Sequence, residues 1–69
     1  MIKFERDDGR YYYMSIEHDL FGDIVLRVLR GGRRTSLLSC VASGSMGGVI
    51  EKAIQLSKRR LQRGYIIVQ

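Results

Sequence analysis

Apolar and polar residues alternate from Met1 to His18, and the alternation is interrupted at Asp7-Asp8-Gly9. This period of two is typical of strands with one buried face, and an Asp-Gly turn between two such runs predicts a β-hairpin. A three-residue loop with Gly9 at positive φ places Phe4 opposite Tyr12 and gathers the apolar side chains on one face. A two-residue turn would divide them between both faces, so the longer loop is predicted. The predicted core face contains Ile2, Phe4, Tyr12, Met14 and Ile16, and the other face contains Lys3, Glu5, Tyr11, Tyr13, Ser15 and Glu17.

Two more strands are predicted after the hairpin. Asp23–Arg30 is rich in β-branched and apolar residues, and Thr35–Ala42 follows it across a turn at Gly31-Gly32-Arg33-Arg34. Both strands carry apolar residues on both faces, whereas a single helix covers one face of a sheet. The second face holds Val25, Leu29 and the two outward tyrosines. We therefore expect this face to be partly exposed or buried against another molecule.

One helix is predicted from Met46 to Arg63, with Ser45 as its N-cap and Gly64 directly after its end. At about 100° per residue, its apolar side chains form one stripe that would pack on the sheet. The stripe contains Met46, Val49, Ile50, Ala53, Ile54, Ser57 and Leu61, with Leu56 at its margin. Tyr65–Val68 is predicted as a short closing strand. The sequence thus predicts an α+β fold: one domain over residues 1–69, with a small antiparallel sheet of four to five strands and one C-terminal amphipathic helix packed on one face.

The composition excludes several functional classes. With 69 residues, of which 45% are hydrophobic, the chain is globular in composition but too short to enclose a substrate cleft between lobes. Its single cysteine, Cys40, and single histidine, His18, predict no disulfide, no metal site and no catalytic residue. We therefore expect no enzymatic activity, no cofactor and no small-molecule substrate. Neither a signal peptide nor a run of about 20 apolar residues is present, which predicts a cytoplasmic protein without a membrane partner.

The charge balance points to a polyanion. Twelve Lys and Arg residues against seven Asp and Glu residues give a net charge of +5, which favours nucleic acid as a partner. One basic cluster follows the third strand and its turn, and a second lies within roughly 40° on the helical wheel, beside the apolar stripe. Together they would meet the spaced phosphates of a backbone without reading bases. Two outward tyrosines of the hairpin would stack on bases or on an exposed end. The candidate contacts are Arg27, Arg30, Arg33, Arg34, Lys52, Arg59, Arg63, Tyr11 and Tyr13.

Several motifs resemble those of the WGR domain family. They are Arg10-Tyr11-Tyr12-Tyr13-Met14-Ser15-Ile16, Asp19-Leu20-Phe21-Gly22, the Gly/Arg turn and Arg63-Gly64-Tyr65. The chain has no tryptophan, and the Trp-Gly-Arg triplet is replaced within Leu29-Arg30-Gly31-Gly32-Arg33. The resemblance, which extends to bacterial members of the family, implies a small sheet with one helix. WGR domains of poly(ADP-ribose) polymerases bind DNA near a break, so the resemblance also implies DNA binding through Arg30, Arg33 and Arg34, without the residue that stacks at the strand end.

Two hypotheses follow from these patterns. The first is a non-enzymatic module that binds nucleic acid, DNA rather than RNA, through its phosphate backbone. The alternative is a protein-interaction or homodimerisation module that has lost DNA binding, suggested by the second apolar sheet face of so small a domain. Arginines that line a groove together with the helix cations favour the first hypothesis. An Arg27 ringed by apolar side chains on a flat face favours the second.

Overall fold

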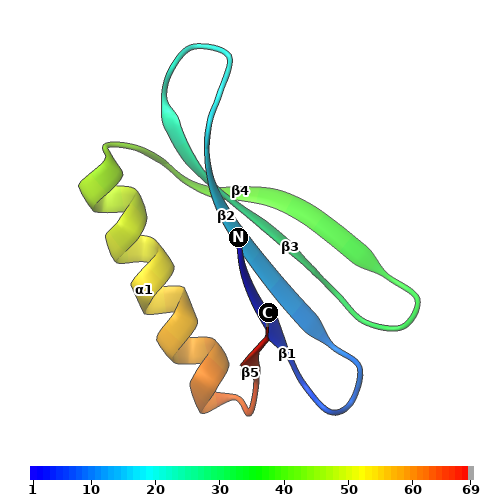
Figure 1. Cartoon of the computed structure of the whole chain (residues 1–69). Helices are drawn as coiled ribbons and strands as arrows, with labels where there is room; N and C mark the ends of the chain where they lie inside the picture. The colour runs from blue at the N-terminus through cyan, green and yellow to red at the C-terminus, as the bar shows by residue number, and fades with distance from the viewer. Residues whose placement is uncertain (69) are drawn as a thin grey trace.

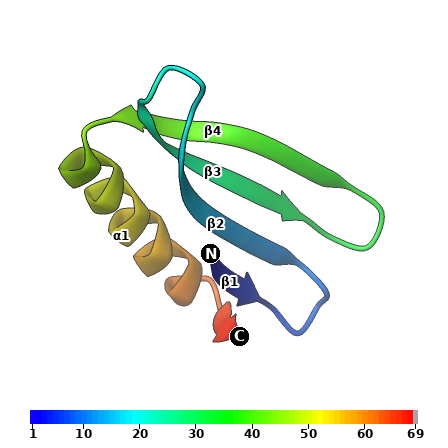
Figure 2. The same ribbon diagram turned by 45° about the horizontal axis from the view of Figure 1, so that its top comes forward.

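The computed structural model describes residues 1–68 as one sheet and one helix (Figure 1). The elements are β1 (Ile2–Glu5), β2 (Tyr11–His18), β3 (Ile24–Gly31), β4 (Ser36–Gly44), α1 (Met46–Gln62) and β5 (Ile66–Val68). All strand pairs are antiparallel in the order β4-β3-β2-β1-β5, so the last strand lies beside the first. Figure 2 shows α1 on one face of the sheet, which we call the helix side; the opposite face is the outer face. The predicted α+β fold is confirmed.

The register of the opening hairpin is the predicted one. Phe4 pairs with Tyr12, and Ile2 pairs with Met14. Gly9 has a φ of 92°, a left-handed conformation that glycine adopts without a steric penalty. The buried core contains Phe4, Tyr12, Met14, Leu26, Val28, Val49, Ala53, Leu56 and Tyr65. The core therefore lies between α1 and the helix side of the sheet, as the alternation in the sequence requires.

The second hairpin is longer than predicted. β3 continues through Gly31, which pairs with both Tyr11 and Ser36. The turn is consequently Gly32-Arg33-Arg34-Thr35, in which the Gly32 N–H donates to the Thr35 carbonyl at 3.0 Å. β4 also runs on to Gly44 and contains a β-bulge, because Ala42 pairs with Leu26 while Cys40 pairs with Arg27. Of the two glycines that suggested a turn, Gly31 is thus accommodated inside the ladder and Gly32 begins the turn.

Local side-chain and backbone contacts set both ends of α1. The Ser45 hydroxyl accepts a hydrogen bond from the Gly48 N–H at 3.2 Å, as an N-cap does. At the other end, the Gly64 N–H donates to the Leu61 carbonyl and the Tyr65 N–H to the Arg60 carbonyl. Gly64 has a φ of 88°, so these two bonds complete a Schellman motif. The predicted cap and end residues are confirmed.

The buried face of α1 is rotated from the predicted stripe. The buried side chains are Val49, Ala53 and Leu56. Met46, Ile50, Ile54 and Leu61 stay 42–52% exposed. The predicted stripe is wider than the strip along which one helix touches a sheet, so only one side of it is buried. Leu56, placed at the margin by the sequence pattern, belongs to the centre of the contact.

Within residues 1–68, no helix combines the length and the apolar character that a membrane span would need. In the same part of the chain, no group of three or more His, Cys, Asp or Glu side chains is placed to hold a metal ion.

Asp8 organises the turn of the opening hairpin. Its carboxylate accepts hydrogen bonds from the Arg6 guanidinium at 2.6 and 3.0 Å, and from the Arg10 backbone N–H at 3.1 Å. The Arg6 side chain, followed by the Arg10 N–H, lowers the pKa of Asp8 from 3.8 to about 2. A carboxyl pKa that is depressed by folding contributes stability above its unfolded value. The contribution of Asp8 is therefore present above about pH 4 and is lost as the pH falls toward 2.

We expect Asp8 to titrate near pH 2 when its carboxyl carbon is followed by NMR. Arg6→Gln removes the main cause of the shift, so the pKa of Asp8 should then rise toward 3.8. Lys58→Gln, on the exposed surface of α1, is the control and should leave the midpoint unchanged. A midpoint near 3.8 in the unaltered protein contradicts the role of Asp8 in the turn.

Candidate nucleic-acid interface

A shallow cleft of about 400 Å³ lies where the sheet extends past the C-terminal end of α1. Three arginines line it: Arg10 before β2, Arg30 in β3 and Arg60 in α1. The remaining lining residues are Tyr11, Tyr12, Gly31, Gly32, Thr35, Ser36, Leu37 and Tyr65. No acidic residue occurs among these described lining residues. We call this site the arginine cleft.

Arg60 is the most constrained cation of the arginine cleft. Its Cζ lies 4.3 Å from the ring centroid of Tyr12 and 5.7 Å from that of Tyr65. Its Nε is buried and has no hydrogen-bond partner among the described residues. Aromatic faces hold a cation in place without neutralising it, and a buried donor without an acceptor carries a free-energy cost. An anion that accepted a hydrogen bond from this Nε would therefore remove that free-energy cost.

Sequence reasoning missed Arg60 and Arg10 as cleft residues. The signal for Arg60 is its spacing: it follows Val49, Ala53 and Leu56 along the row of α1 that faces the sheet. The row of helix positions that brings Leu56 onto the sheet thus brings an arginine over Tyr12. Arg10 precedes β2 and also lies 3.6 Å from the Asp8 carboxylate, so its charge is partly compensated.

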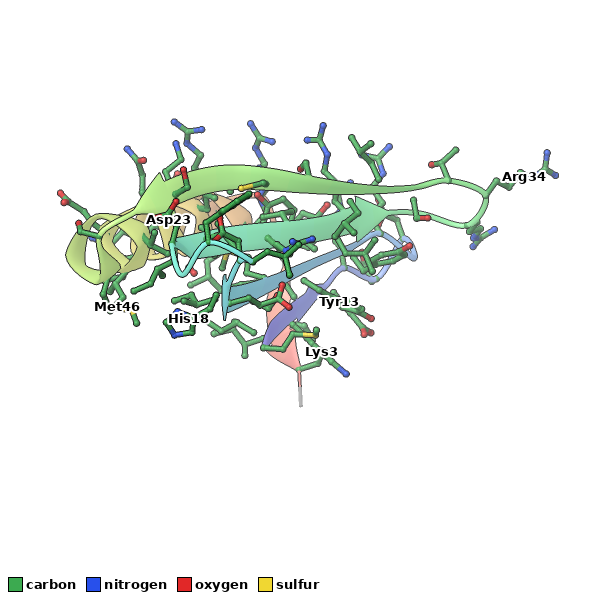
Figure 3. The ribbon with its side chains drawn as sticks, turned by 90° about the horizontal axis from the view of Figure 1, so that it is seen from above. Lys3, Tyr13, His18, Asp23, Arg34 and Met46 are labelled. Atoms are coloured by element: carbon green, nitrogen blue, oxygen red, sulfur yellow. The ribbon has the colours of Figure 1, made fainter. Side chains whose placement is uncertain are left out.

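The predicted arginines of the second hairpin have three different placements. Arg30 pairs with Tyr12 and Leu37 in the ladder and lines the arginine cleft. Arg33 lies against the first hairpin, since a Cβ on Gly9 would be 3.6 Å from its Cγ. Arg34 projects from the tip of the β3–β4 hairpin (Figure 3). None of these three arginines forms an ion pair with a residue in the described range.

The helix cations lie on the flank of α1 toward β4. Ala53 lines a hollow together with Ile2 of β1 and Ile16 of β2. The flank of α1 next to Ala53 therefore faces β1. Lys52, Arg59 and Arg63 lie on the other side of the buried row. Figure 3 shows a row of nitrogen-tipped side chains beyond β4, on the side of the molecule opposite Lys3. Arg59 and Arg63 lie within one helical turn of Arg60, so the C-terminal end of this flank adjoins the arginine cleft.

Arg27 lies on a different face of the sheet from the arginine cleft. Alternate residues of a strand face opposite sides, so Arg27 points to the outer face while Arg30 points to the helix side. There its Nε lies 3.2 Å from the Glu17 carboxylate, which compensates its charge. The expectation that Arg27 extends the same positive surface is therefore not met in the structure.

The predicted stacking tyrosines are engaged with their neighbours on the outer face. The rings of Tyr11 and Tyr13 lie 5.0 Å apart, and Lys3 lies 5.5 Å from the Tyr13 ring. The Tyr13 hydroxyl donates to the Glu5 carboxylate at 2.9 Å, and this hydrogen bond raises the pKa of Tyr13. The contacts of Tyr13 with Lys3 and Glu5 are cross-strand contacts between β1 and β2, and the contact of Tyr11 with Tyr13 lies along β2. Tyr11 also borders the arginine cleft, whereas Tyr13 lies away from it.

Comparison of the chain with protein-family models, with curated proteins and with solved structures found no match. The likeness to WGR domains stays a prediction from sequence motifs. What the fold adds is a chemical arrangement: an arginine cleft beside a flank of helix cations.

Proposed function

We propose that this domain binds nucleic acid through its phosphate backbone and catalyses no reaction. The observation that carries the proposal is the arginine cleft, which Arg10, Arg30 and the stacked Arg60 line together, with no acidic residue among its described lining residues. Guanidinium groups pair with phosphate oxygens through two parallel hydrogen bonds, which makes arginine suited to this ligand. The preference for DNA over RNA comes from the resemblance of the motifs to those of WGR domains.

The helix cations extend this contact along one strand of the nucleic acid. Lys52 and Arg63 are separated by about 16 Å of helix, the axial length of roughly five phosphates of one DNA strand. Arg59 lies between them on the same flank, and Arg33 and Arg34 continue the basic surface at the hairpin. Contacts of this kind give affinity and orientation but carry no base sequence information.

The test is a fluorescence polarisation titration of a labelled DNA duplex at two or more salt concentrations. Binding should weaken steeply with salt, because each neutralised phosphate releases counterions. Arg30→Gln should weaken binding to all sequences alike and reduce the slope of log K against log salt by about one. A Kd weaker than millimolar at low salt, or a flat salt dependence, refutes the proposal.

Arg27→Gln is the matched control, because it removes the same charge from the same strand but on the outer face. It should leave both affinity and salt slope nearly unchanged. Equal losses for Arg27→Gln and Arg30→Gln would mean that net charge, and not the arginine cleft, carries binding. An RNA duplex of the same sequence tests the nucleic-acid type, and tighter binding to RNA overturns the preference for DNA.

A further inference from the structure

A single helix leaves part of the helix side uncovered. Five strands spaced by about 4.8 Å span roughly 19 Å, whereas a helix is about 10 Å wide. α1 packs mainly against β4, β3 and β2, so its contact with the sheet is centred away from β1 and β5. Ile67 of β5 pairs with Phe4 and therefore points to the helix side, where it stays exposed. Apolar side chains thus continue beyond the edge of α1.

The exposed side of α1 faces this open area. Met46, Ile50, Ile54 and Leu61 form a row along α1 that we call the apolar ridge. Between the ridge and the strands lies a hollow of about 190 Å³, whose lining includes Ile2, Ile16 and Ala53. No charged side chain occurs among its described lining residues. Ridge and hollow together form one apolar surface with two complementary parts.

We propose that this surface binds a second copy of the chain, with the apolar ridge of each copy packed into the hollow of the other. Such an interface is isologous: a twofold axis places the ridge of the first copy in the hollow of the second, and the ridge of the second in the hollow of the first. The proposal is independent of nucleic-acid binding, because it uses the flank of α1 opposite Lys52, Arg59 and Arg63.

The charge distribution favours a second copy at this surface. Each copy carries a net charge of +5, so association through a cationic face would be repulsive. The four residues of the apolar ridge are uncharged, and Glu51 and Lys58 adjoin the ridge at Ile54. Pairing through the ridge leaves Arg59 and Arg63 on the opposite flank of α1. On the outer face, Leu29 and Leu38 lie around Arg27. That face also carries the charges of Lys3, Glu5 and Glu17, which makes it a poorer interface than the uncharged ridge.

The available area places the interface in a size class. Eight large apolar side chains, which are 41–78% exposed, contribute to this surface. They are Met1, Ile2, Ile16, Met46, Ile50, Ile54, Leu61 and Ile67. Together they expose on the order of 500 Å² of apolar area per copy. A dimer would then bury about 1,000 Å², near the lower limit for a specific interface. Interfaces of this small size are typical of weak, transient association, so we expect a reversible dimer with a Kd of about 1–100 μM.

Sedimentation equilibrium of the full chain, without nucleic acid, tests the dimer over roughly a hundredfold range of concentration around this Kd. The mass should rise from monomer to dimer, and Ile54→Glu should raise the dimer Kd at least tenfold. Gln55→Glu is the matched control: it introduces the same side chain at the next residue, off the apolar ridge, and should leave the Kd within twofold. Circular dichroism checks that Ile54→Glu is folded, and Leu61→Gln is a second ridge variant expected to weaken the dimer.

Salt separates this association from nucleic-acid binding. Screening reduces repulsion between two basic copies, so the dimer should persist or strengthen as salt rises, whereas backbone binding weakens. If the protein is monomeric at all concentrations, the proposal is overturned, and the apolar surface would then bind a different partner. A second outcome would also overturn the proposal: dimerisation that is abolished by Leu38→Glu but not by Ile54→Glu. Leu38 lies on the outer face, so that result would place the interface there.

Discussion

Phe4→Ala should leave much of the protein unfolded at room temperature. The Phe4 side chain is 0% exposed and lies on an inner strand, paired with Tyr12 of β2 on one side and Ile67 of β5 on the other. Truncation of a buried phenylalanine costs about 3–5 kcal/mol of unfolding free energy, because a cavity remains. A domain of this length has only about 3–10 kcal/mol in total. Urea unfolding followed by circular dichroism measures the loss.

Phe21→Ala is the matched control for Phe4→Ala. The chain has two phenylalanines, and Phe21 is 90% exposed in the connection between β2 and β3. The same truncation there creates no cavity, so the unfolding free energy should change by less than about 0.5 kcal/mol. Comparable losses for the two variants would contradict the hairpin register that buries Phe4.

The sequence predicts those parts of the fold that depend on local chemistry. The pairing of Phe4 with Tyr12 follows from the alternation and from one glycine at positive φ. The start of α1 at Ser45 and its end at Gly64 follow from capping. The rotation of α1 about its axis could not be predicted in this way. Apolar residues cover more than one possible contact face of the helix, and packing against the sheet determines which of these faces is buried. The position of β5 beside β1 likewise depends on the chain returning from the far end of α1.

The candidate site is less predictable because it joins distant segments. Arg10, Arg30 and Arg60 come from three different elements, and no local spacing relates them. Strand alternation does separate Arg27 from Arg30, and the structure places these two on opposite faces. To predict that Arg60 lines the cleft, the rotation of α1 about its axis would have to be known first. Basic residues thus point to a class of partner, while the fold decides which of them share a surface.

Gly31→Ala should disrupt the arginine cleft through its backbone. A Cβ on Gly31 would overlap the Thr35 carbonyl oxygen and lie 2.8 Å from the Tyr11 hydroxyl and 2.9 Å from the Ser36 Cα. Two of these atoms belong to the backbone beside the turn, so β4 must shift to make room. Overpacking of this kind costs about 1–3 kcal/mol, and the Tm should fall by about 5 °C or more. Thermal unfolding followed by circular dichroism measures the effect.

Gly32→Ala makes the same change one residue later and should have little effect. The nearest atom to a Cβ on Gly32 is the Arg10 Cγ at 3.8 Å, an ordinary van der Waals contact. Because Gly31 directly follows Arg30, its displacement moves Arg30 relative to Arg60, and Gly31→Ala should also weaken DNA binding where Gly32→Ala does not. Equal Tm values for the two variants would mean that the close approach of β3 to the turn is absent in solution, and with it the geometry that holds the arginine cleft together.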